Sequence, residues 1–514
     1  MGSASTDSSD ATHGAAPPHP PIHLLFGALM LVLLLAALDQ TIVSTALPTI
    51  VGDLGGFDSL SWVVTAYLLS STIVVPLYGK LGDLFGRRIV MQAAIVIFLC
   101  GSALCGLAQT MDQLILTRAL QGLGGGGLMV VVMAAIGDVI APAERGRYQG
   151  LLGGVFGLAT VIGPLLGGFI VQHLSWRWIF YINLPLGVLA LLVIAAVFHP
   201  HARHVKHEID YFGALFLAIA LTAIILFTSQ GGTTLPWSSI QLWVELAAGL
   251  VALVGFVIEE RGAAEPIIPL ELFRQRTFLL CSLIGLLVGA SLFGSVTYLP
   301  LYLQVVKGAT PTGAGTQLIP LMGGLLTTSI VSGRLISRIG RYRMFPIAGM
   351  AIACIGLGLL GTLGDRTPVA TLYLYAGILG AGLGMVMQVL VLAVQNSVDF
   401  RHLGVATSGV TLFRSIGGSL GVAAFGALFT QRLDRRIDGF MPRAPAGAPR
   451  RALRPELIDK LPPELHQKFL HAFAQSLHGV FYIAAGVAAI GFAMTWLLRD
   501  IPLRSATAHR GSRA

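Results

Sequence analysis

Apolar runs long enough to cross a lipid bilayer recur from residue 23 to residue 498, interrupted by charged, proline and glycine clusters. A membrane-spanning helix needs about 20 mostly apolar residues. Dividing the runs at these clusters gives fourteen segments, so the pattern predicts an all-α polytopic membrane protein. The predicted spans are 23–47, 58–78, 89–108, 113–137, 148–172, 178–198, 210–229, 241–259, 277–305, 314–335, 344–363, 368–395, 403–430 and 476–498.

The composition supports this prediction. Of the 514 residues, 55% are hydrophobic and 11% are charged, and the mean hydropathy is +0.79. Soluble proteins carry about 25% charged residues. The composition therefore excludes a soluble enzyme, a secreted disulfide scaffold and a one-pass receptor. The four cysteines lie inside apolar runs and are interpreted as small buried side chains.

The net charge of +9 is distributed over short loops between the apolar runs, which does not favour a nucleic-acid partner. If the amino terminus is cytoplasmic, fifteen Lys and Arg residues lie in short inner loops, from Lys80 to Arg401. Only Arg177, Lys307 and Arg366 then lie in short outer loops. Basic residues favour the cytoplasmic side, so both termini are predicted to be cytoplasmic.

An internal repeat indicates two related halves. Residues 79–88 read GKLGDLFGRR after the second span, and residues 333–342 read GRLISRIGRY after the tenth. The two occurrences are eight spans apart, so two additional helices are expected between two six-helix halves. The predicted organisation is a disordered cytoplasmic tail (1–21), an N-terminal six-helix bundle (22–200), two additional transmembrane helices with a linker (201–275), a C-terminal six-helix bundle with a long outer loop at 431–474 (276–498), and a cytoplasmic tail (499–514).

The sequence contains no motif for using nucleotide energy or for catalysis. The Gly79-Lys80 pair lacks the other residues of a P-loop, and no nucleophile motif lies in a suitable loop, so an enzyme is not expected. A transporter of this kind would use an ion gradient. Asp39 follows a long apolar run, and an ionised carboxylate at that depth is costly unless it binds a proton or a partner.

Arg118 in the fourth span is predicted to lie at the depth of Asp39. Two interpretations remain open. The pair can be a static ion pair that joins two helices, or a proton switch in which separation from the arginine raises the pKa of the carboxyl group. Arg414 in the thirteenth span is a third deep charge, and it can either line a cavity or make a structural contact.

The segment 79–88 combines glycines with charges. Gly79 and Gly86 favour a tight turn and close helix approach, and Asp83 is expected at the positive end of the third helix. Arg87 and Arg88 are expected to fix the turn at the cytoplasmic face. Topology signalling alone would explain the arginines, but not Asp83 or the glycine spacing.

The fifth span contains a proline between glycines, which predicts a helix that packs closely and can bend. The residues of this predicted hinge are Gly163, Pro164, Gly167 and Gly168. A histidine cluster at 199–207 lies in a basic inner loop, where a solvated loop is favoured over metal binding. No metal site and no cofactor other than protons as coupling ion are predicted.

Together these motifs resemble the major facilitator superfamily, and in particular its fourteen-spanner drug–proton antiporter branch. The resemblance covers residues 23–498 and is carried by 79–88, by Asp39-Gln40-Thr41 with Ala46-Leu47-Pro48, by Arg118 with Gln121-Gly122, by the 163–168 pattern, and by WRWIF at 176–180 with Asn183-Leu184-Pro185. It implies two six-helix bundles rocking about a central cavity, with two additional helices outside. It also implies that Asp83 holds the cytoplasmic side closed and that Asp39 and Arg118 couple transport to protonation. The second repeat departs from the pattern, because Ser337 stands where Asp83 stands in the first.

The predicted function is proton-coupled export of lipophilic compounds, such as drugs and antibiotics, by alternating access. Because Asp39 is the only deep carboxylate, neutral or monocationic substrates are expected and dications are not. The alternatives are a dedicated exporter of one endogenous metabolite or lipid and, from a different class, a membrane sensor without transport. The protein is expected to function as a monomer. A bacterial inner membrane is the expected location, because Arg outnumbers Lys by 28 to 5, which suggests a GC-rich bacterial genome. The candidate cavity residues are Gln40, Thr41, Gln121, Tyr298, Gln304, Gln388 and Arg414.

Overall fold

The computed structural model describes residues 22–55, 60–198, 210–232, 235–309, 317–438 and 462–503. Within these ranges the regular structure is helical, apart from one isolated bridge between Gly231 and Leu235. A helix satisfies its own backbone hydrogen bonds, which is what a lipid environment requires. Thirteen of the described helical stretches are long and apolar enough to cross a membrane, and a shorter apolar helix accompanies them. The predicted all-α polytopic fold is confirmed.

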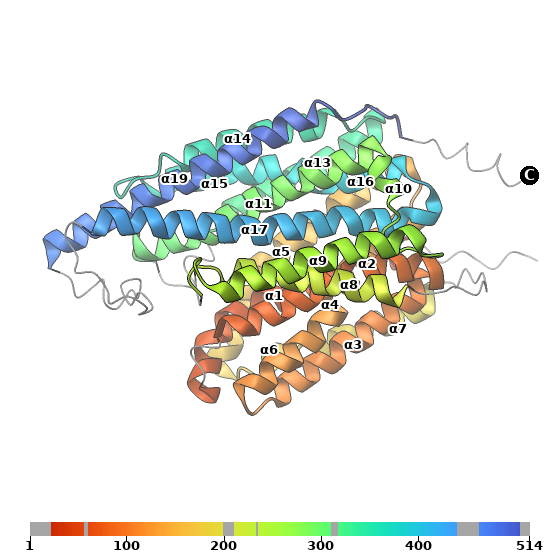
Figure 1. Cartoon of the computed structure of the whole chain (residues 1–514), viewed down its shortest axis with the longest axis horizontal. Helices are drawn as coiled ribbons and strands as arrows, with labels where there is room; N and C mark the ends of the chain where they lie inside the picture. The colour runs from red at the N-terminus through yellow and green to blue at the C-terminus, as the bar shows by residue number, and fades with distance from the viewer. Residues whose placement is uncertain are drawn as a thin grey trace, which may run out of the picture.

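The first half of the chain forms one bundle, drawn from red through orange to yellow in Figure 1. In this bundle α4 packs between α2 and α3, while α1 packs against α5 and α7. The glycine run of α4 allows these close contacts, because helices with small residues at their interfaces can approach one another. The helices are α1 Ile22–Leu54, α2 Leu60–Phe85, α3 Arg87–Leu107, α4 Met111–Val139, α5 Pro142–His173, α6 Trp178–Tyr181 and α7 Asn183–Val197.

The second bundle, drawn from green to blue, lies above the first in Figure 1. Here α11 packs against α17 and α19, and α15 packs against α13 and α14. The helices are α10 Glu271–Arg274, α11 Arg276–Val305, α13 Ile319–Ile339, α14 Met344–Leu360, α15 Val369–Gly384, α16 Met387–Ser397, η2 Phe400–His402, α17 Leu403–Ile437 and α19 Pro463–Thr495. The break between α15 and α16 divides a single predicted span.

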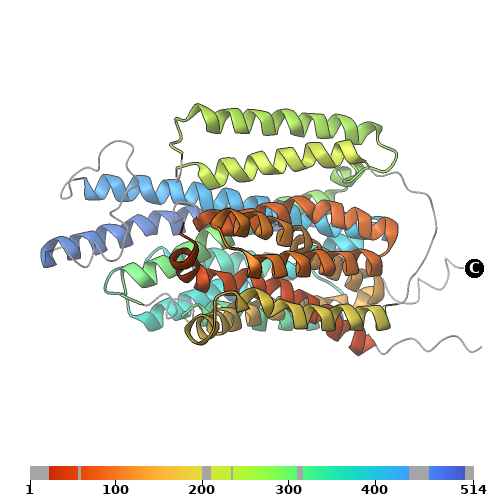
Figure 2. The same cartoon turned by 90° about the horizontal axis from the view of Figure 1, so that it is seen from below.

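The two helices between the halves, α8 (Tyr211–Gln230) and α9 (Ile240–Gly262), pack mainly against each other. Figure 2 shows this pair along one side of the molecule, where α8 contacts α2 and α17. The segment that follows α9 is attached to the first bundle, because Lys80 Nζ lies 2.5 Å from Glu265 Oε2. The pair therefore bridges the outer surface where the two halves meet.

Three predicted boundaries need correction. Segment 79–88 is almost entirely helical, since α2 continues to Phe85 and α3 begins at Arg87. Only Gly86 forms the turn, with a φ of 86° that favours glycine. The predicted outer loop 431–474 is wrong at both ends, because α17 continues to Ile437 and α19 begins at Pro463. Helical turns outside the lipid carry polar residues, so hydropathy does not detect them.

The predicted tails lie largely outside the described residues. Residues 1–21 and 504–514 are not described, nor are 199–209, which contain the histidine cluster. The beginning of the C-terminal tail is attached to the second bundle. Leu503 N donates to Gly340 O at 3.0 Å, and Asn396 Nδ2 donates to Pro502 O at 3.2 Å. Residues 501–503 therefore lie against the helix ends that the sequence places on the cytoplasmic side.

Candidate functional site: two buried charge networks

Asp39 lies in the middle of α1 and has no solvent-accessible surface. Its Oδ2 accepts a hydrogen bond from Arg118 Nη1 at 2.7 Å. Its Oδ1 accepts from Gln121 Nε2 at 2.8 Å and from Asn183 Nδ2 at 3.0 Å. We call Asp39, Arg118, Gln121 and Asn183 the Asp39 network. It joins α1, α4 and α7, and all of its members belong to the first bundle.

The sequence predicted that Asp39 and Arg118 share a depth, and the structure shows that they are also in contact. The arginine is enclosed as well. Arg118 is 2% exposed. Its Nη1 also donates to Gln121 Oε1 at 2.7 Å, and its guanidinium carbon lies 4.2 Å from the centre of the Tyr67 ring. A buried arginine cannot release its proton, so it needs this full set of acceptors and a ring face to remain charged at low cost.

The position of Gln121 follows from two glycines. A Cβ on Gly101 of α3 would lie 2.5 Å from the backbone of Gln121, so α3 and α4 touch at this level. A Cβ on Gly122 would lie 2.5 Å from Tyr67 O, so α2 and α4 touch one residue further along. Only glycine permits both contacts, and together they place the Gln121 amide beside the carboxylate.

Sequence reasoning missed two members of this region. Asn183 was noted only as part of a family pattern, and Ser102 was not considered. Asn183 Nδ2 also donates to Ser102 Oγ at 3.0 Å, and Ser102 Oγ donates to Phe180 O at 2.8 Å. Both side chains are almost fully buried. The signal in the sequence was a carboxamide two residues after the aromatic-rich segment 176–181, because a buried amide requires a hydrogen-bond partner.

A second network lies at the cytoplasmic end of α2, according to the predicted topology. Asp83 is paired with Arg87, and Arg87 Nε lies 2.7 Å from Asp138 Oδ2 of α4. Asp83 also accepts hydrogen bonds across the bundle interface, from Gly404 N at 3.0 Å and Val405 N at 2.9 Å. We call Asp83, Arg87, Asp138 and these two amides the Asp83 network.

This geometry corrects the expected partner of Asp83. The positive helix end that holds its carboxylate belongs to α17 of the second bundle, and not to α3. Asp83 lies in the last turn of α2, which crosses the first turn of α17. Free amides at the start of a helix are natural partners for an anion. The network therefore joins the two halves, whereas the Asp39 network does not.

The glycines of this segment have separate roles. A Cβ on Gly79 would lie 2.7 Å from Gly404 O, so α2 and α17 are in backbone contact. Gly86 makes the turn, and nothing lies within 4 Å of a Cβ built on it. Arg88 Nη2 donates to Ala195 O at 2.7 Å and thereby ties the start of α3 to α7.

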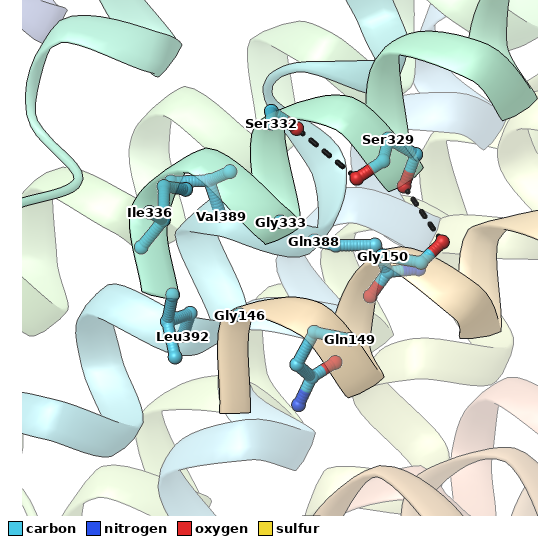
Figure 3. A pocket seen from close by; sticks show the side chains of 10 residues that line it. All are labelled: Gly146, Gln149, Gly150, Ser329, Ser332, Gly333, Ile336, Gln388, Val389 and Leu392. Carbon is cyan, nitrogen blue, oxygen red and sulfur yellow. Dashed lines mark hydrogen bonds between the residues drawn. The ribbon is translucent and has the colours of Figure 1, made fainter. Parts of the chain in front are cut away.

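The second repeat makes a matching contact between α13 and α5. A Cβ on Gly146 would lie 2.8 Å from Gly333 O, and Ser329 Oγ donates to Gly150 O at 3.2 Å. Figure 3 shows this contact and the small cavity beside it. The cavity measures about 10 Å³, and Gln149 and Gln388 line it with buried carbonyl oxygens that have no partner among the described residues. We call the α2–α17 and α5–α13 contacts the inner interface.

The predicted hinge of α5 lies beside α1 just beyond Asp39. A Cβ on Gly163 would lie 2.7 Å from Thr41 Cβ, and one on Gly167 would lie 2.8 Å from Ile42 O. Pro164 is inside the helix, and Gly168 has open space around it. The glycines at 163 and 167 therefore set the spacing between α1 and α5 next to the buried carboxylate.

The candidate cavity residues do not form one group. Gln121 belongs to the Asp39 network, and Thr41 Oγ1 donates to Ala159 O of α5 at 3.0 Å. Tyr298 is buried against α17, with its hydroxyl donating to Val422 O at 3.4 Å. Gln388 lines the small cavity of the inner interface. Gln40, Gln304 and Arg414 are half-buried.

No group of three or more His, Cys, Asp or Glu residues is positioned to hold a metal ion in the part of the chain that the structure describes. The site therefore consists of carboxylates, arginines and amides. Such groups can bind protons and organic ligands, and they can hold or release contacts between helices.

Comparison with known proteins finds relatives that are described as transporters. A family model described as Major Facilitator Superfamily matches residues 29–422. An uncharacterized MFS-type transporter of Mycobacterium tuberculosis is 44% identical over 97% of this chain and 73% of its own length. The multidrug transporter protein MdtP of Bacillus subtilis is 38% identical over 93% of each chain. Among solved structures, the proton:xylose symporter XylE shares the fold, with a TM-score of 0.63 and 14% identity over 94% of this chain and 97% of its own.

Proposed function

The chain belongs to the Major Facilitator Superfamily, and we propose that it is a proton-coupled antiporter that exports lipophilic compounds that are neutral or carry a single charge. As a member of that family it is a multi-pass membrane transporter and not an enzyme. Relatives named as multidrug proteins, at 35% and 38% identity, support drug-like substrates. Relatives named as efflux pumps, at 32% and 33% identity, support outward transport. The sequence favours monocations among the singly charged compounds.

The observation that carries the proposal is the complete burial of Asp39 among three donors. These donors together satisfy both oxygens of the carboxylate. If Arg118 moves away, a carboxylate in an apolar interior becomes costly and binds a proton. Under this proposal Asp39 alternates between two states, ionised in contact with Arg118 and protonated when Arg118 has moved away. A rearrangement of α1 against α4 would change one into the other.

The inner interface supplies the second requirement of alternating access, which is a closed side. The contacts of α2 with α17 and of α5 with α13 lie at the end where the charge distribution predicts the cytoplasm. Opening toward the cytoplasm requires Asp83 to release the amides of α17. We propose that proton binding at Asp39 and release at Asp83 belong to one cycle. The hinge glycines of α5 connect them, because α5 contacts α1 at Gly163 and α13 at Gly146.

The same proposal includes the membrane location, the orientation and the oligomeric state of the protein. We expect a bacterial cell membrane, both termini in the cytoplasm, and a monomer that completes the cycle by itself. The excess of basic residues in the predicted inner loops supports the orientation. Both networks lie within a single chain, which supports a functional monomer.

Transport in proteoliposomes under an imposed pH gradient tests this function. A panel of lipophilic probes would include neutral, monoanionic and monocationic compounds. We expect the gradient to drive uphill transport by the wild-type protein and not by Asp39→Asn, while probe exchange without a gradient persists in both. Asp112→Asn is the matched control, because Asp112 is an exposed acid on the helix that carries Arg118. Gradient-driven transport by Asp39→Asn at the wild-type rate would contradict the proposal.

A further inference from the structure

Arg414 lies near the middle of the membrane-spanning part of α17. It is eleven residues beyond Leu403, which is about 16 Å along a helix and about half of a bilayer's apolar thickness. A charge at this depth is costly, and an arginine cannot lower the cost by releasing its proton. Some group must therefore compensate the guanidinium.

The described protein supplies no such group. Arg414 has no hydrogen-bond acceptor and no acidic partner among the described residues. The helices that pack against α17 are α2, α4, α8, α11, α16 and α19, and their acids lie only in the first or last turns. Two of these acids are already paired with Arg87, and Asp39 of α1 is held by Arg118. The acids on the packed helices are Asp83, Asp112, Asp138 and Glu464.

The surroundings of Arg414 also differ from those of Arg118. Arg118 is enclosed by Asp39, Gln121 and the Tyr67 ring, whereas Arg414 keeps part of its side chain accessible. On the neighbouring helix α11, Gly289 lets the backbone of α17 approach, and a Cβ built on Gly285 would lie 4.0 Å from the Cβ of Arg414. The two positions of α11 beside the backbone of Arg414 thus carry no side chain, and the residues of α11 around them are apolar.

We propose that Arg414 is the substrate-recognition residue for an organic monoanion, such as a lipophilic carboxylate or sulfonate. This inference rests on the proposed function and specifies the sign of the single charge, replacing the expectation of a monocation. A guanidinium binds a carboxylate through two parallel hydrogen bonds, and the apolar residues of α11 beside it would contact the rest of a lipophilic molecule. The anion neutralises Arg414, so that the second bundle no longer contains an isolated charge while the protein changes conformation.

The division of charges between the halves follows. The proton is handled by Asp39 and Arg118 in the first bundle, and the substrate charge is handled by Arg414 in the second. Proton and substrate therefore need not compete for one carboxylate. The first bundle would contain one charge that a proton neutralises, and the second bundle one charge that the substrate anion neutralises.

Equilibrium binding to the purified full-length protein in lipid nanodiscs tests the inference without any gradient. The probes are pyrenebutanoate, its uncharged methyl ester and pyrenebutylamine, with empty nanodiscs measuring partition into lipid. We expect the carboxylate to bind roughly tenfold or more tightly than the ester, the scale of a charge-assisted hydrogen bond. In Arg414→Gln this preference disappears while ester binding persists, and in Arg414→Lys part of it remains. Arg276→Gln, which removes an exposed charge at the start of α11, should leave it unchanged.

Three results would overturn the inference. The carboxylate could bind no better than the ester or the amine, the preference could survive in Arg414→Gln, or that variant could weaken the acid and the ester equally. Retained ester binding in Arg414→Gln also shows that the variant is folded. An Arg414-dependent carboxylate preference without gradient-driven export would contradict only the proposed function. Gradient-driven export without a carboxylate preference would contradict only this inference.

Discussion

The Asp39 network and the Asp83 network each combine an arginine with at least one carboxylate, yet they join different parts of the molecule. Asp39 is held by side chains of α4 and α7, within one bundle. Asp83 is held by Arg87 of α3 and by backbone amides of α17, across two bundles. Rocking of one bundle against the other must therefore break the contacts of Asp83, while Asp39 can keep its partners or change them. In the proposed function, the first network binds the proton and the second closes one side.

Removing one partner from the Asp39 network should have the largest effect. Arg118→Gln leaves a carboxylate buried without its counter-charge, which costs about 3–5 kcal/mol for pairs of this kind. We expect a clearly lower thermal unfolding midpoint in detergent. The double variant Asp39→Asn with Arg118→Gln should recover most of the loss, because no unpaired charge remains. If the single variant were as stable as wild type, the pair would not be the buried electrostatic unit described above.

A methyl group at the α2–α17 crossing should have the next largest effect. The Cβ of Gly79→Ala would lie 2.7 Å from the carbonyl oxygen of Gly404, and such overpacking typically costs about 1–3 kcal/mol. The inner interface should open, with a matching loss of gradient-driven transport. Gly358→Ala on α14, where nothing lies within 4 Å of the new carbon, is the control. Equal gradient-driven transport by Gly79→Ala and Gly358→Ala would show that α2 and α17 are not in close contact at Gly79.

Asp83→Asn should weaken the Asp83 network without adding bulk. The amide retains one acceptor oxygen but loses the charge that faces the α17 amides and Arg87. Helix-capping interactions are worth about 0.5–2 kcal/mol, so the fraction of molecules open on the inner side should rise by roughly 2- to 30-fold.

Distances between spin labels report this shift for Asp83→Asn. Suitable sites are Glu144 and Arg338, which are exposed at the inner ends of α5 and α13, in a background without the native cysteines. We expect a longer label-to-label distance in the variant. An unchanged distribution would contradict the role assigned to Asp83.

A substitution in the second repeat (333–342) should have the smallest effect, and it compares the two repeats directly. Ser337 occupies the position of Asp83, and its hydroxyl accepts a bond from Arg147 N of α5 at 3.1 Å. Ser337→Asp would place a carboxylate four residues before Arg341, as Asp83 stands before Arg87. Exposed pairs contribute about 0–1 kcal/mol, so we expect a slightly more closed inner interface by the same label distances. A more open interface would show that the two repeats are not mechanically equivalent.

The sequence predicted the features that stand out against an apolar background. Charges inside long apolar runs identified Asp39, Arg118 and Arg414, and hydropathy placed the spans. The roles of short neutral partners, such as Ser102 and Asn183, could not be predicted because polar residues of this kind are common in membrane helices.

Contacts between distant parts of the chain could not be predicted. Asp83 meets Gly404 across 321 residues, and no local pattern encodes that meeting. That Arg414 has no partner among the described residues became visible only when the neighbouring helices were in place. The helix ends beyond the predicted spans, at Ile437 and Pro463, were missed because hydropathy detects apolar runs and not helix formation.

Direct measurement of proton movement tests the central claim, that Asp39 couples protonation to transport. Proteoliposomes containing a trapped pH-sensitive dye would be given an outward gradient of a transported probe. The account predicts probe-dependent acidification of the lumen with wild-type protein and with Asp112→Asn, and none with Asp39→Asn. Acidification of equal rate with Asp39→Asn would contradict the account.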